Sequence, residues 1–290
     1  MVGVEYDGCK VTRSGFVTLV GRPNVGKSSL VNAMCGRKVS IVSDKPQTTR
    51  RQVRGIVTRP EGQLVFVDTP GLHKPVTALG ERVNTAALDS IVDVDVVCLV
   101  IDATQTVGSG DSWVASRLDV ARSVVVLNKI DAVPRETVVE QLAKLSSLDA
   151  ESYFPVSART GEGVDALVDH LFGRLPEGPL YYPDDAISDV SESDWVAELV
   201  REELLGMMHD ELPYSIATRV VDVEDGRIVC EILVERESQK GMVIGRGGAV
   251  LKRVGRRVRK QLPPGTALDL KVKVDKDWQR RPERIERLGY

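Results

Sequence analysis

Between residues 16 and 174, short apolar runs alternate with segments in which apolar residues recur every three to four positions. Several runs consist almost entirely of Val, Ile and Leu, which is typical of strands buried on both faces. Strands that alternate with helices predict an α/β fold, with a mostly parallel sheet covered by helices on both sides. The predicted strands span residues 16–20, 53–58, 64–67, 96–101, 124–127 and 153–156, and the predicted helices span residues 27–35, 80–90, 112–118, 136–147 and 164–172.

The pattern changes after residue 175. Residues 176–190 are dense in Pro, Gly and Asp without periodicity, as in a linker. We therefore expect one domain at residues 14–175, a linker at 176–190 and a second domain at 191–290, in line with the prior for a chain of 290 residues. The second domain is predicted to be α+β, with helices at 191–208, 250–262 and 281–288, strands at 214–223, 227–234 and 267–274, and a short helical turn from residue 240.

Composition bears mainly on the compartment. The four cysteines, Cys9, Cys35, Cys98 and Cys230, form no C-x-x-C pair, which argues against a zinc site or a disulfide framework and suits a reducing cytosol. No apolar run approaches the roughly 18 residues that span a bilayer, and residues 1–10 lack the apolar segment of a signal peptide. A cytoplasmic protein is expected.

Charge is divided unevenly along the chain, although the net charge is only −3. Residues 236–290 carry 16 basic and 6 acidic side chains, a balance of +10, whereas residues 1–235 carry 23 basic and 36 acidic ones, a balance of −13. A basic end of this kind predicts a polyanionic partner, either nucleic acid or an acidic membrane.

The sequence Gly21-Arg22-Pro23-Asn24-Val25-Gly26-Lys27-Ser28 matches the G-x-x-x-x-G-K-[ST] pattern between a predicted strand and a predicted helix. Backbone N–H groups of such a loop surround phosphate oxygens, and the helix N-terminus, which includes Ser29, adds its positive dipole. Lys27 is expected to reach the β- and γ-phosphates, and the hydroxyl of Ser28 to bind Mg²⁺. The alternative is a Gly/Pro turn without a ligand, which the complete motif in this context disfavours.

A second motif, Asp68-Thr69-Pro70-Gly71, follows the predicted strand at 64–67. Ligands of parallel sheets bind at such strand ends. Asp68 is expected to hold Mg²⁺ through water, and the N–H of Gly71 to contact the γ-phosphate. Without this context, the same four residues would be equally typical of a turn that binds no ligand.

A third motif, Asn128-Lys129-Ile130-Asp131, follows the predicted strand at 124–127. The Asp131 carboxylate can accept two hydrogen bonds from guanine, so it is expected to select GTP over ATP, while Lys129 packs over the base and Asn128 ties this loop to the P-loop. Ser157 and Ala158, after the last predicted strand, are expected to support the base through backbone N–H groups. Read by itself, N-K-x-D is also a plausible helix-capping turn.

In this order the motifs resemble the translation-factor-like GTPases over residues 14–175. The resemblance implies GTP and GDP as ligands, Mg²⁺ as cofactor, and hydrolysis supported by Lys27, Gly71 and a threonine that binds Mg²⁺, with Thr49 favoured and Thr48 the alternative. Leu72 stands where many such enzymes place a glutamine that orients water, so slow intrinsic hydrolysis is expected. Asn24 resembles an asparagine that helps related GTPases bind K⁺, so K⁺-stimulated hydrolysis is a hypothesis, against the alternative that Asn24 only stiffens the loop.

The element order of the second domain, with Gly245-Arg246-Gly247-Gly248 between two helices, is similar to that of a type II KH domain. A G-x-x-G loop lets an RNA backbone approach closely. The alternative for the basic helix at 250–262 is a solvated face, but six basic residues without an acid are more than solubility requires. The expected RNA contacts are Val243, Ile244, Gly245, Arg246, Gly247, Gly248, Lys252, Arg253, Arg256 and Arg257.

Together, the two domains resemble the Era family of bacterial GTPases, which act in assembly of the small ribosomal subunit. The match spans about residues 14–290 and includes Gln47-Thr48-Thr49-Arg50 and the residues Leu72-His73. It implies binding to 16S ribosomal RNA near its 3′ end and to the 30S subunit, coupled to the nucleotide state, with peripheral association at the inner face of the plasma membrane. A monomeric state is expected. Two alternatives are a signalling GTPase recruited to a membrane or a protein through a basic KH-like domain, and a nucleotide-gated RNA chaperone with negligible turnover, which Leu72 would permit.

Overall fold

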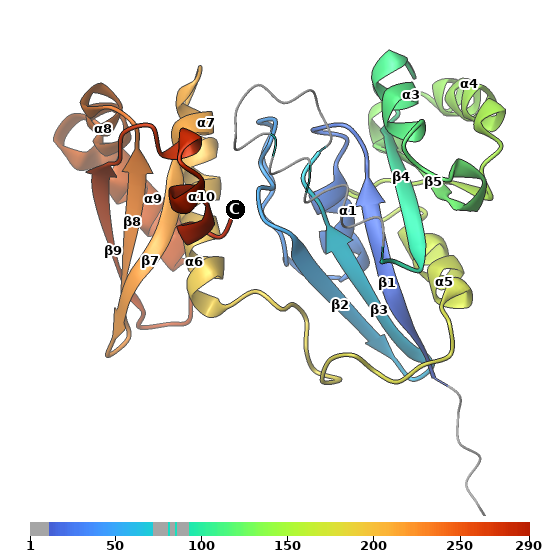
Figure 1. The fold of residues 1–290 in the computed structure, drawn as a ribbon, viewed down its shortest axis with the longest axis horizontal. Coiled ribbons are helices and arrows are strands. Elements are labelled where there is room, and N and C mark those ends of the chain that lie inside the picture. The colour runs from blue at the N-terminus through green and yellow to red at the C-terminus, as the bar shows by residue number, and fades with distance from the viewer. Residues whose placement is uncertain (1–11, 72–80, 82–84, 86–92) are drawn as a thin grey trace, which may run out of the picture. The chain divides into compact units, whose positions relative to one another are not determined.

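The computed structural model describes residues 12–71, 81, 85 and 93–290 (Figure 1). The chain divides into two compact units, and segments far apart in sequence belong to each of them. The domain limits expected at 14–175, 176–190 and 191–290 stay a prediction. The first unit comprises Met1–Ser40, Val53–Asp68 and Asp89–Asp189, and the second comprises Ile41–Gln52, Thr69–Leu88 and Val190–Tyr290.

The first unit is built on a six-stranded sheet with the order β2-β3-β1-β4-β5-β6. β2 pairs antiparallel with β3, and every other pair is parallel, which confirms the mostly parallel sheet. The side chains of β3 are all buried, as expected for a strand covered on both faces. The strands are β1 (Arg13–Val20), β2 (Val53–Arg59), β3 (Gly62–Asp68), β4 (Val96–Asp102), β5 (Val124–Asn128) and β6 (Ser152–Pro155).

Four helices of this unit are described, together with three short 3₁₀ turns. α1 and α5 contact one another and both contact β3, so they cover the same region of the sheet. The helix predicted at 80–90 lies outside the described residues, apart from residues 81 and 85. The helices are α1 (Lys27–Met34), α3 (Ser109–Ala115), α4 (Arg135–Leu145) and α5 (Val164–Arg174), and the turns are η1 (Val120–Arg122), η2 (Ile130–Ala132) and η3 (Ser146–Leu148).

Residues 176–189, expected as a linker, lie along the first unit. The buried Gln63 of β3 accepts hydrogen bonds of 2.9 Å from the N–H groups of Tyr181 and Tyr182 through its side-chain oxygen. The N–H of Ile56 in β2 donates to the carbonyl of Ile187 at 3.0 Å. These contacts satisfy backbone groups that an extended segment cannot pair within itself.

The second unit has a three-stranded sheet with the order β7-β8-β9, in which β7 and β8 are antiparallel and β8 and β9 parallel. α6 and α8 both contact α9, and the apolar faces of these helices form one core with the sheet. This is the expected α+β arrangement. The elements are α6 (Glu192–Leu205), α7 (Leu212–Ser215), β7 (Ala217–Glu224), β8 (Arg227–Val234), α8 (Glu237–Ile244), η4 (Arg246–Gly248), α9 (Ala249–Arg259), β9 (Ala267–Val274), η5 (Trp278–Arg280) and α10 (Pro282–Arg287).

Two local predictions in this unit were wrong. The strand expected from residue 214 begins at Ala217, because Pro213 stands at the start of the short helix α7, where its fixed φ is favourable. The helical turn expected from residue 240 is α8, which begins at Glu237. The side-chain oxygen of Gln239 accepts hydrogen bonds from the N–H groups of Glu235 and Arg236 and so stabilises that earlier start.

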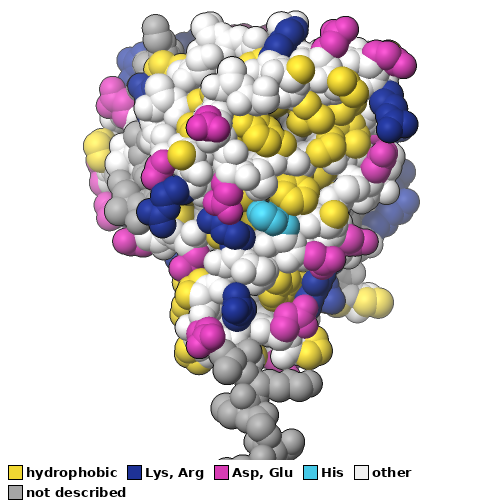
Figure 2. Space-filling model, turned by 90° about the vertical axis from the view of Figure 1, so that its right-hand side faces the viewer, with side chains coloured by type: hydrophobic (Ala, Val, Ile, Leu, Met, Phe, Trp, Pro, Cys, Tyr) yellow, Lys and Arg dark blue, Asp and Glu magenta, His cyan; other side chains and the backbone are white. Residues whose placement is uncertain are grey.

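The surface adds two observations. Within the described part of the chain, every helix is too short or too polar to span a bilayer. On the face drawn in Figure 2, hydrophobic side chains gather in a patch bordered by acidic and basic ones. Exposed apolar area is common on folded proteins, so the patch does not by itself identify a site.

Candidate nucleotide-binding and RNA-binding sites

The P-loop connects β1 to α1, and two of its glycines are required by space. A Cβ atom on Gly21 would lie 2.4 Å from the carbonyl oxygen of Val100 in the neighbouring strand β4. Gly26 has a φ of +95°, and a Cβ atom there would lie 2.4 Å from Nδ2 of Asn128. Only glycine fits either place without a shift of its neighbours. The remaining loop residues lie between these points or in the first turn of α1, namely Arg22, Pro23, Asn24, Val25, Lys27, Ser28 and Ser29.

Lys27 is held inside the P-loop. Its side chain is buried, and its Nζ donates hydrogen bonds of 3.0 Å to the carbonyls of Gly21 and Arg22. Burial lowers the pKa of Lys27 to about 8, while the charge of Asp68 acts in the opposite direction. A phosphate group at this place would favour the charged ammonium, so the position fits the phosphate contact predicted for Lys27.

Asp68 ends β3 inside the same unit. Its Oδ2 accepts a 2.6 Å hydrogen bond from Oγ of Ser40, and the Ser28 hydroxyl also hydrogen-bonds to the carboxylate. Its Oδ1 is buried without a hydrogen-bond partner, and burial raises the pKa of the group. An unsatisfied carboxylate oxygen beside a hydroxyl is a donor set that suits Mg²⁺, which prefers oxygen ligands. Ser28 and Asp68 are therefore the residues that would hold the ion, and Ser40 is a neighbour that no motif indicated.

The N-K-x-D motif follows β5 and reaches back to the P-loop. Nδ2 of Asn128 donates to the carbonyl of Val25 at 3.0 Å, and Oδ1 of Asn128 accepts from the N–H of Ala158 at 3.1 Å. Oδ1 of Asp131 accepts a 2.6 Å hydrogen bond from the Ser157 hydroxyl. The N–H of Ser157 donates to the carbonyl of Glu162. Because both of these N–H groups have partners in the chain, the base contact expected of them stays a prediction.

Several of the residues predicted to bind nucleotide or Mg²⁺ belong to the second unit and not to the unit of the P-loop. These are Thr49, Thr69, Pro70 and Gly71. Leu72 lies outside the described residues. Their positions against a nucleotide therefore stay a prediction. Among the described residues there is no group of three or more His, Cys, Asp or Glu side chains that could hold a metal ion.

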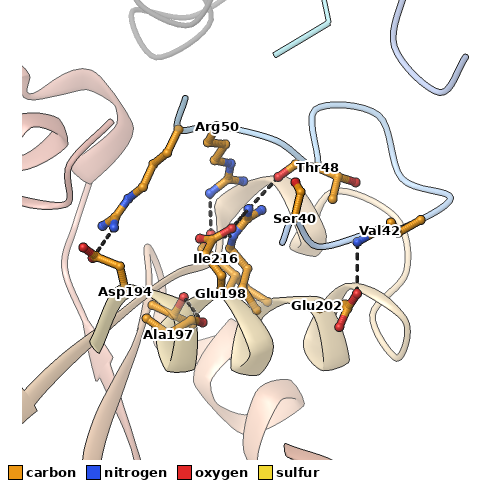
Figure 3. A network of polar contacts seen from close by, with 12 residues as sticks. Ser40, Val42, Thr48, Arg50, Asp194, Ala197, Glu198, Glu202 and Ile216 are labelled. Atoms are coloured by element: carbon orange, nitrogen blue, oxygen red, sulfur yellow. Dashed lines mark hydrogen bonds and ion pairs between the residues drawn. The ribbon is translucent and has the colours of Figure 1, made fainter. Parts of the chain in front are cut away.

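Residues 41–52, which carry Thr49, are bonded to the C-terminal part of the second unit by charged side chains (Figure 3). Nη1 of Arg50 donates to the carbonyl of Ile216 at 2.6 Å, and its Nη2 donates to the carbonyl of Tyr214 at 2.8 Å. Nη2 of Arg201 in α6 donates to the carbonyl of Thr48. Arg50 and Arg201 are both buried, so the segment is fixed by charge-assisted bonds shielded from water.

Further contacts extend this attachment. The N–H of Val42 donates to Oε1 of Glu202 at 3.0 Å, and Arg51 pairs with Asp194 at the start of α6. The guanidinium of Arg50 also lies 5.8 Å from the ring centre of Trp278, within the range of a cation–π contact. The segment was expected only as a polar loop with a Mg²⁺-binding threonine.

The G-x-x-G loop joins α8 to α9. Gly245 has a φ of +72°, and a Cβ atom there would lie 2.5 Å from Cγ2 of Val250. Cβ atoms at Gly247 and Gly248 would meet no atom within 4 Å, so the loop faces open space. Val243 is fully buried in the core, whereas Ile244 is partly exposed. The basic side chains expected to contact RNA are all exposed, namely Arg246, Lys252, Arg253, Arg256 and Arg257, although Arg257 pairs with Glu203 at 3.1 Å.

Several charged residues that support these sites were missed. Asp102, at the end of β4, pairs with Lys129, and Asp111 of α3 pairs with Arg22 of the P-loop at 3.0 Å. A carboxylate that ends a buried strand is a signal that could have indicated Asp102. Arg50 had no such signal, because its partners are backbone carbonyls far along the chain.

Comparison with known proteins agrees with this geometry. The family profile described as "50S ribosome-binding GTPase" matches residues 16–129, and that of the KH domain matches residues 211–279. GTPase Era of Mycobacterium sp. (strain KMS) is 48% identical over 296 residues, which cover 96% of this chain and 99% of that protein. GTPase Era of Mycobacterium tuberculosis (strain ATCC 25177 / H37Ra) is 48% identical over 295 residues, which cover 96% and 98%.

Two solved structures are similar over the same extent. A variant of Aquifex aeolicus Era bound to GDP·AlF₄⁻ has a TM-score of 0.91 and 36% identity, covering 96% of this chain and 99% of that one. Era in complex with MgGDPNP and nucleotides 1506–1542 of 16S ribosomal RNA has a TM-score of 0.92 and 36% identity at the same coverage. With a P-loop GTPase domain, a KH domain and relatives matched over nearly their whole length, this chain belongs to the Era family and is a GTPase, which hydrolyses GTP to GDP and phosphate.

Proposed function

We propose that this GTPase binds 16S ribosomal RNA near its 3′ end through the KH domain and acts in assembly of the 30S subunit under control of the bound nucleotide. The observation that carries the proposal is the likeness, at 36% identity, to Era solved with MgGDPNP and nucleotides 1506–1542 of 16S ribosomal RNA. GTP or GDP with Mg²⁺ would occupy the P-loop site, in keeping with the presence of MgGDPNP in that complex. A cytoplasmic location, contact with the membrane surface and a monomeric state stay predictions.

The exposed basic loop supports RNA as the ligand. Arg246 adjoins Gly247 in the loop and Arg253 lies in α9 directly after it, both exposed, and the surroundings of Gly247 and Gly248 are open, so a phosphate backbone could approach the N–H groups of the loop. Phosphate contacts of this kind supply affinity, and stacked or hydrogen-bonded bases supply sequence preference. The alternative of a membrane-recruited or protein-recruited GTPase uses the same charge but needs no base contacts.

Residues 41–52 are the proposed route from nucleotide to RNA. In GTP-bound form, Thr49 would bind Mg²⁺, while its neighbours Thr48 and Arg50 are bonded to α6 and to the residues before β7. A ligand shifts a conformational equilibrium only by its different affinities for the two states. Because Thr49 lies between Thr48 and Arg50, which are both bonded to the second unit, GTP and GDP are expected to favour different arrangements of this segment, and the RNA affinity should follow.

The experiment is a titration of full-length protein with a short single-stranded RNA matching the 3′ end of 16S ribosomal RNA. A scrambled RNA of equal length is the control, with GDP and with a non-hydrolysable GTP analogue at a stated salt concentration. A preference for the matching RNA that changes with the nucleotide supports the proposal. Equal, salt-sensitive binding of both RNAs in both states contradicts it, and tighter binding to anionic vesicles than to RNA supports the alternative.

A further inference from the structure

Asp102 is a buried carboxylate at the C-terminal end of β4, and its two oxygens have different partners. Oδ2 lies 2.6 Å from Nζ of Lys129. Oδ1 accepts hydrogen bonds from the N–H of Thr104 at 2.9 Å and from its hydroxyl at 2.6 Å. Asp102 is only 1% exposed, and a buried charge is costly unless it is paired. Oδ1 therefore stabilises the turn after β4, while Oδ2 pairs with Lys129.

Lys129 is fixed from two sides by this arrangement. Its Nζ also donates a 2.7 Å hydrogen bond to the carbonyl of Asn24 in the P-loop. Its backbone is in the left-handed region with a φ of +67°, which few residues other than glycine and asparagine favour. The four-carbon stem is thus held between β4, the P-loop and the N-K-x-D loop.

We infer that Asp102 is a positioning residue for the guanine nucleotide, which acts by holding the Lys129 side chain where its stem packs over the base. The inference rests on the guanine site proposed for Lys129 and Asp131. Without the carboxylate, the Nζ of Lys129 keeps only the neutral carbonyl of Asn24, and the long side chain regains rotamers that a bound base must then remove. The side chain of Asp102 pairs with Lys129 and Thr104, neither of them in the P-loop, so its loss should weaken binding without slowing the chemical step.

The test is a double-mutant cycle on full-length protein with GDP and GTP. Asp102→Asn should raise the dissociation constant of GDP about tenfold, as expected for one charge-assisted hydrogen bond, and leave kcat at saturating GTP within about twofold. Lys129→Met should weaken binding by at least as much. The double variant should bind GDP as Lys129→Met alone does, because a positioning residue has no effect without the side chain that it positions.

Two controls separate this role from a loss of folding. Thr104→Val removes the hydroxyl from Oδ1 but leaves the Lys129 pair, and Asp95→Asn removes a carboxylate that accepts from the N–H of Phe16 near the opposite end of β4. Both should keep the GDP affinity within about twofold. A melting temperature is measured for every variant. If Asp102→Asn unfolds the protein, Asp102→Ser takes its place in the cycle. The GDP affinity is then measured for Asp102→Ser alone, for Lys129→Met alone and for the double variant.

The outcomes distinguish the two levels of the argument. If Lys129→Met binds GDP normally, the proposed guanine site is wrong. If Lys129→Met weakens binding but Asp102→Asn does not, the role of Asp102 is wrong and the site stands. Losses that multiply in the double variant would also overturn the inference, because they would show that Asp102 acts independently of Lys129.

Discussion

Nη1 of Arg50 donates a 2.6 Å hydrogen bond to the carbonyl oxygen of Ile216, which lies 166 positions later in the sequence. Nη2 of the same guanidinium donates hydrogen bonds to the carbonyls of Tyr214 and Pro213. These carbonyls precede β7, where the chain leaves α7 and has no helical partner for them. A residue beside the Mg²⁺-binding candidate Thr49 thus completes the hydrogen bonding of the KH-containing unit.

Arg50→Ala should destabilise the protein. It takes the Arg50 donor away from the buried carbonyls of Ile216 and Pro213, while the carbonyl of Tyr214 keeps Nε2 of Gln279 at 3.0 Å. We therefore expect the free energy of unfolding to fall by about 3 kcal/mol. Urea denaturation measures this. Arg54→Ala is the matched control, because Arg54 is a 38% exposed side chain paired with Asp189 and should cost less than about 1 kcal/mol. Equal losses in the two variants would contradict the importance given to Arg50.

Thiol labelling can assign that loss to one unit. Burial raises the pKa of Cys98 in β4 and of Cys230 in β8 to about 12, so both thiols are protonated and unreactive at pH 8. An alkylating reagent with detection by mass spectrometry should leave both unmodified in the native protein. In Arg50→Ala, Cys230 should react faster while Cys98 keeps its rate. Acceleration of both thiols to the same degree would mean that Arg50 stabilises the whole chain.

Hydrolysis should depend on the monovalent cation. A K⁺ ion near the β- and γ-phosphates would neutralise developing charge, so kcat should be about tenfold or more higher in K⁺ than in Na⁺ at equal ionic strength. The backbone of Asn24 has a φ of +65°, which glycine also tolerates. Asn24→Gly therefore keeps the loop and removes only the side chain, and it should lose the K⁺ effect. Equal hydrolysis rates of the unchanged protein in K⁺ and in Na⁺ would contradict the hypothesis of K⁺-stimulated hydrolysis.

RNA affinity should become less dependent on salt when a basic residue near the G-x-x-G loop is removed. For each RNA phosphate that Arg246→Ala or Arg253→Ala no longer neutralises, the slope of log K against log[salt] should become shallower by about 0.7. Arg227→Ala is the control, because Arg227 is an exposed arginine of the same unit that pairs with Asp269 across β8 and β9. A slope that changes equally in all three variants would indicate general attraction and no defined groove.

The elements that the sequence predicted well are those whose pattern is local. β8 and β9 have the expected bounds, because apolar residues mark both strands, and the residues Glu224-Asp225-Gly226 make a turn directly before β8. The P-loop and N-K-x-D residues were predicted correctly as motifs, because the residues of each motif are close in sequence and their spacing is set by the nucleotide that they are expected to bind. The polarity of residues 43–50 was equally visible, yet the partners of Arg50 were not, since backbone carbonyls leave no signature in a sequence.

The same limit explains residues 176–189 and Asp102. Pro and Gly mark the absence of helix or strand, but they do not show that Gln63 holds the backbone of Tyr181 and Tyr182. The place of Asp102 after a predicted apolar run indicates a polar residue at a strand end, but only the pairing of β4 with β5 shows that its partner is Lys129.

The inclusion of residues 41–52 in the KH-containing unit has a consequence for how such a protein can change in evolution. A fragment that begins at Val190 would lack the carbonyl of Thr48 for the fully buried Arg201 and the guanidinium that serves Ile216. The RNA-binding domain is therefore not expected to fold as an independent unit when it is transferred to another protein, unless that protein supplies a loop that makes the same hydrogen bonds. Recombination at the apparent linker should yield poorly folded chimaeras unless residues 41–52 are inherited together with it.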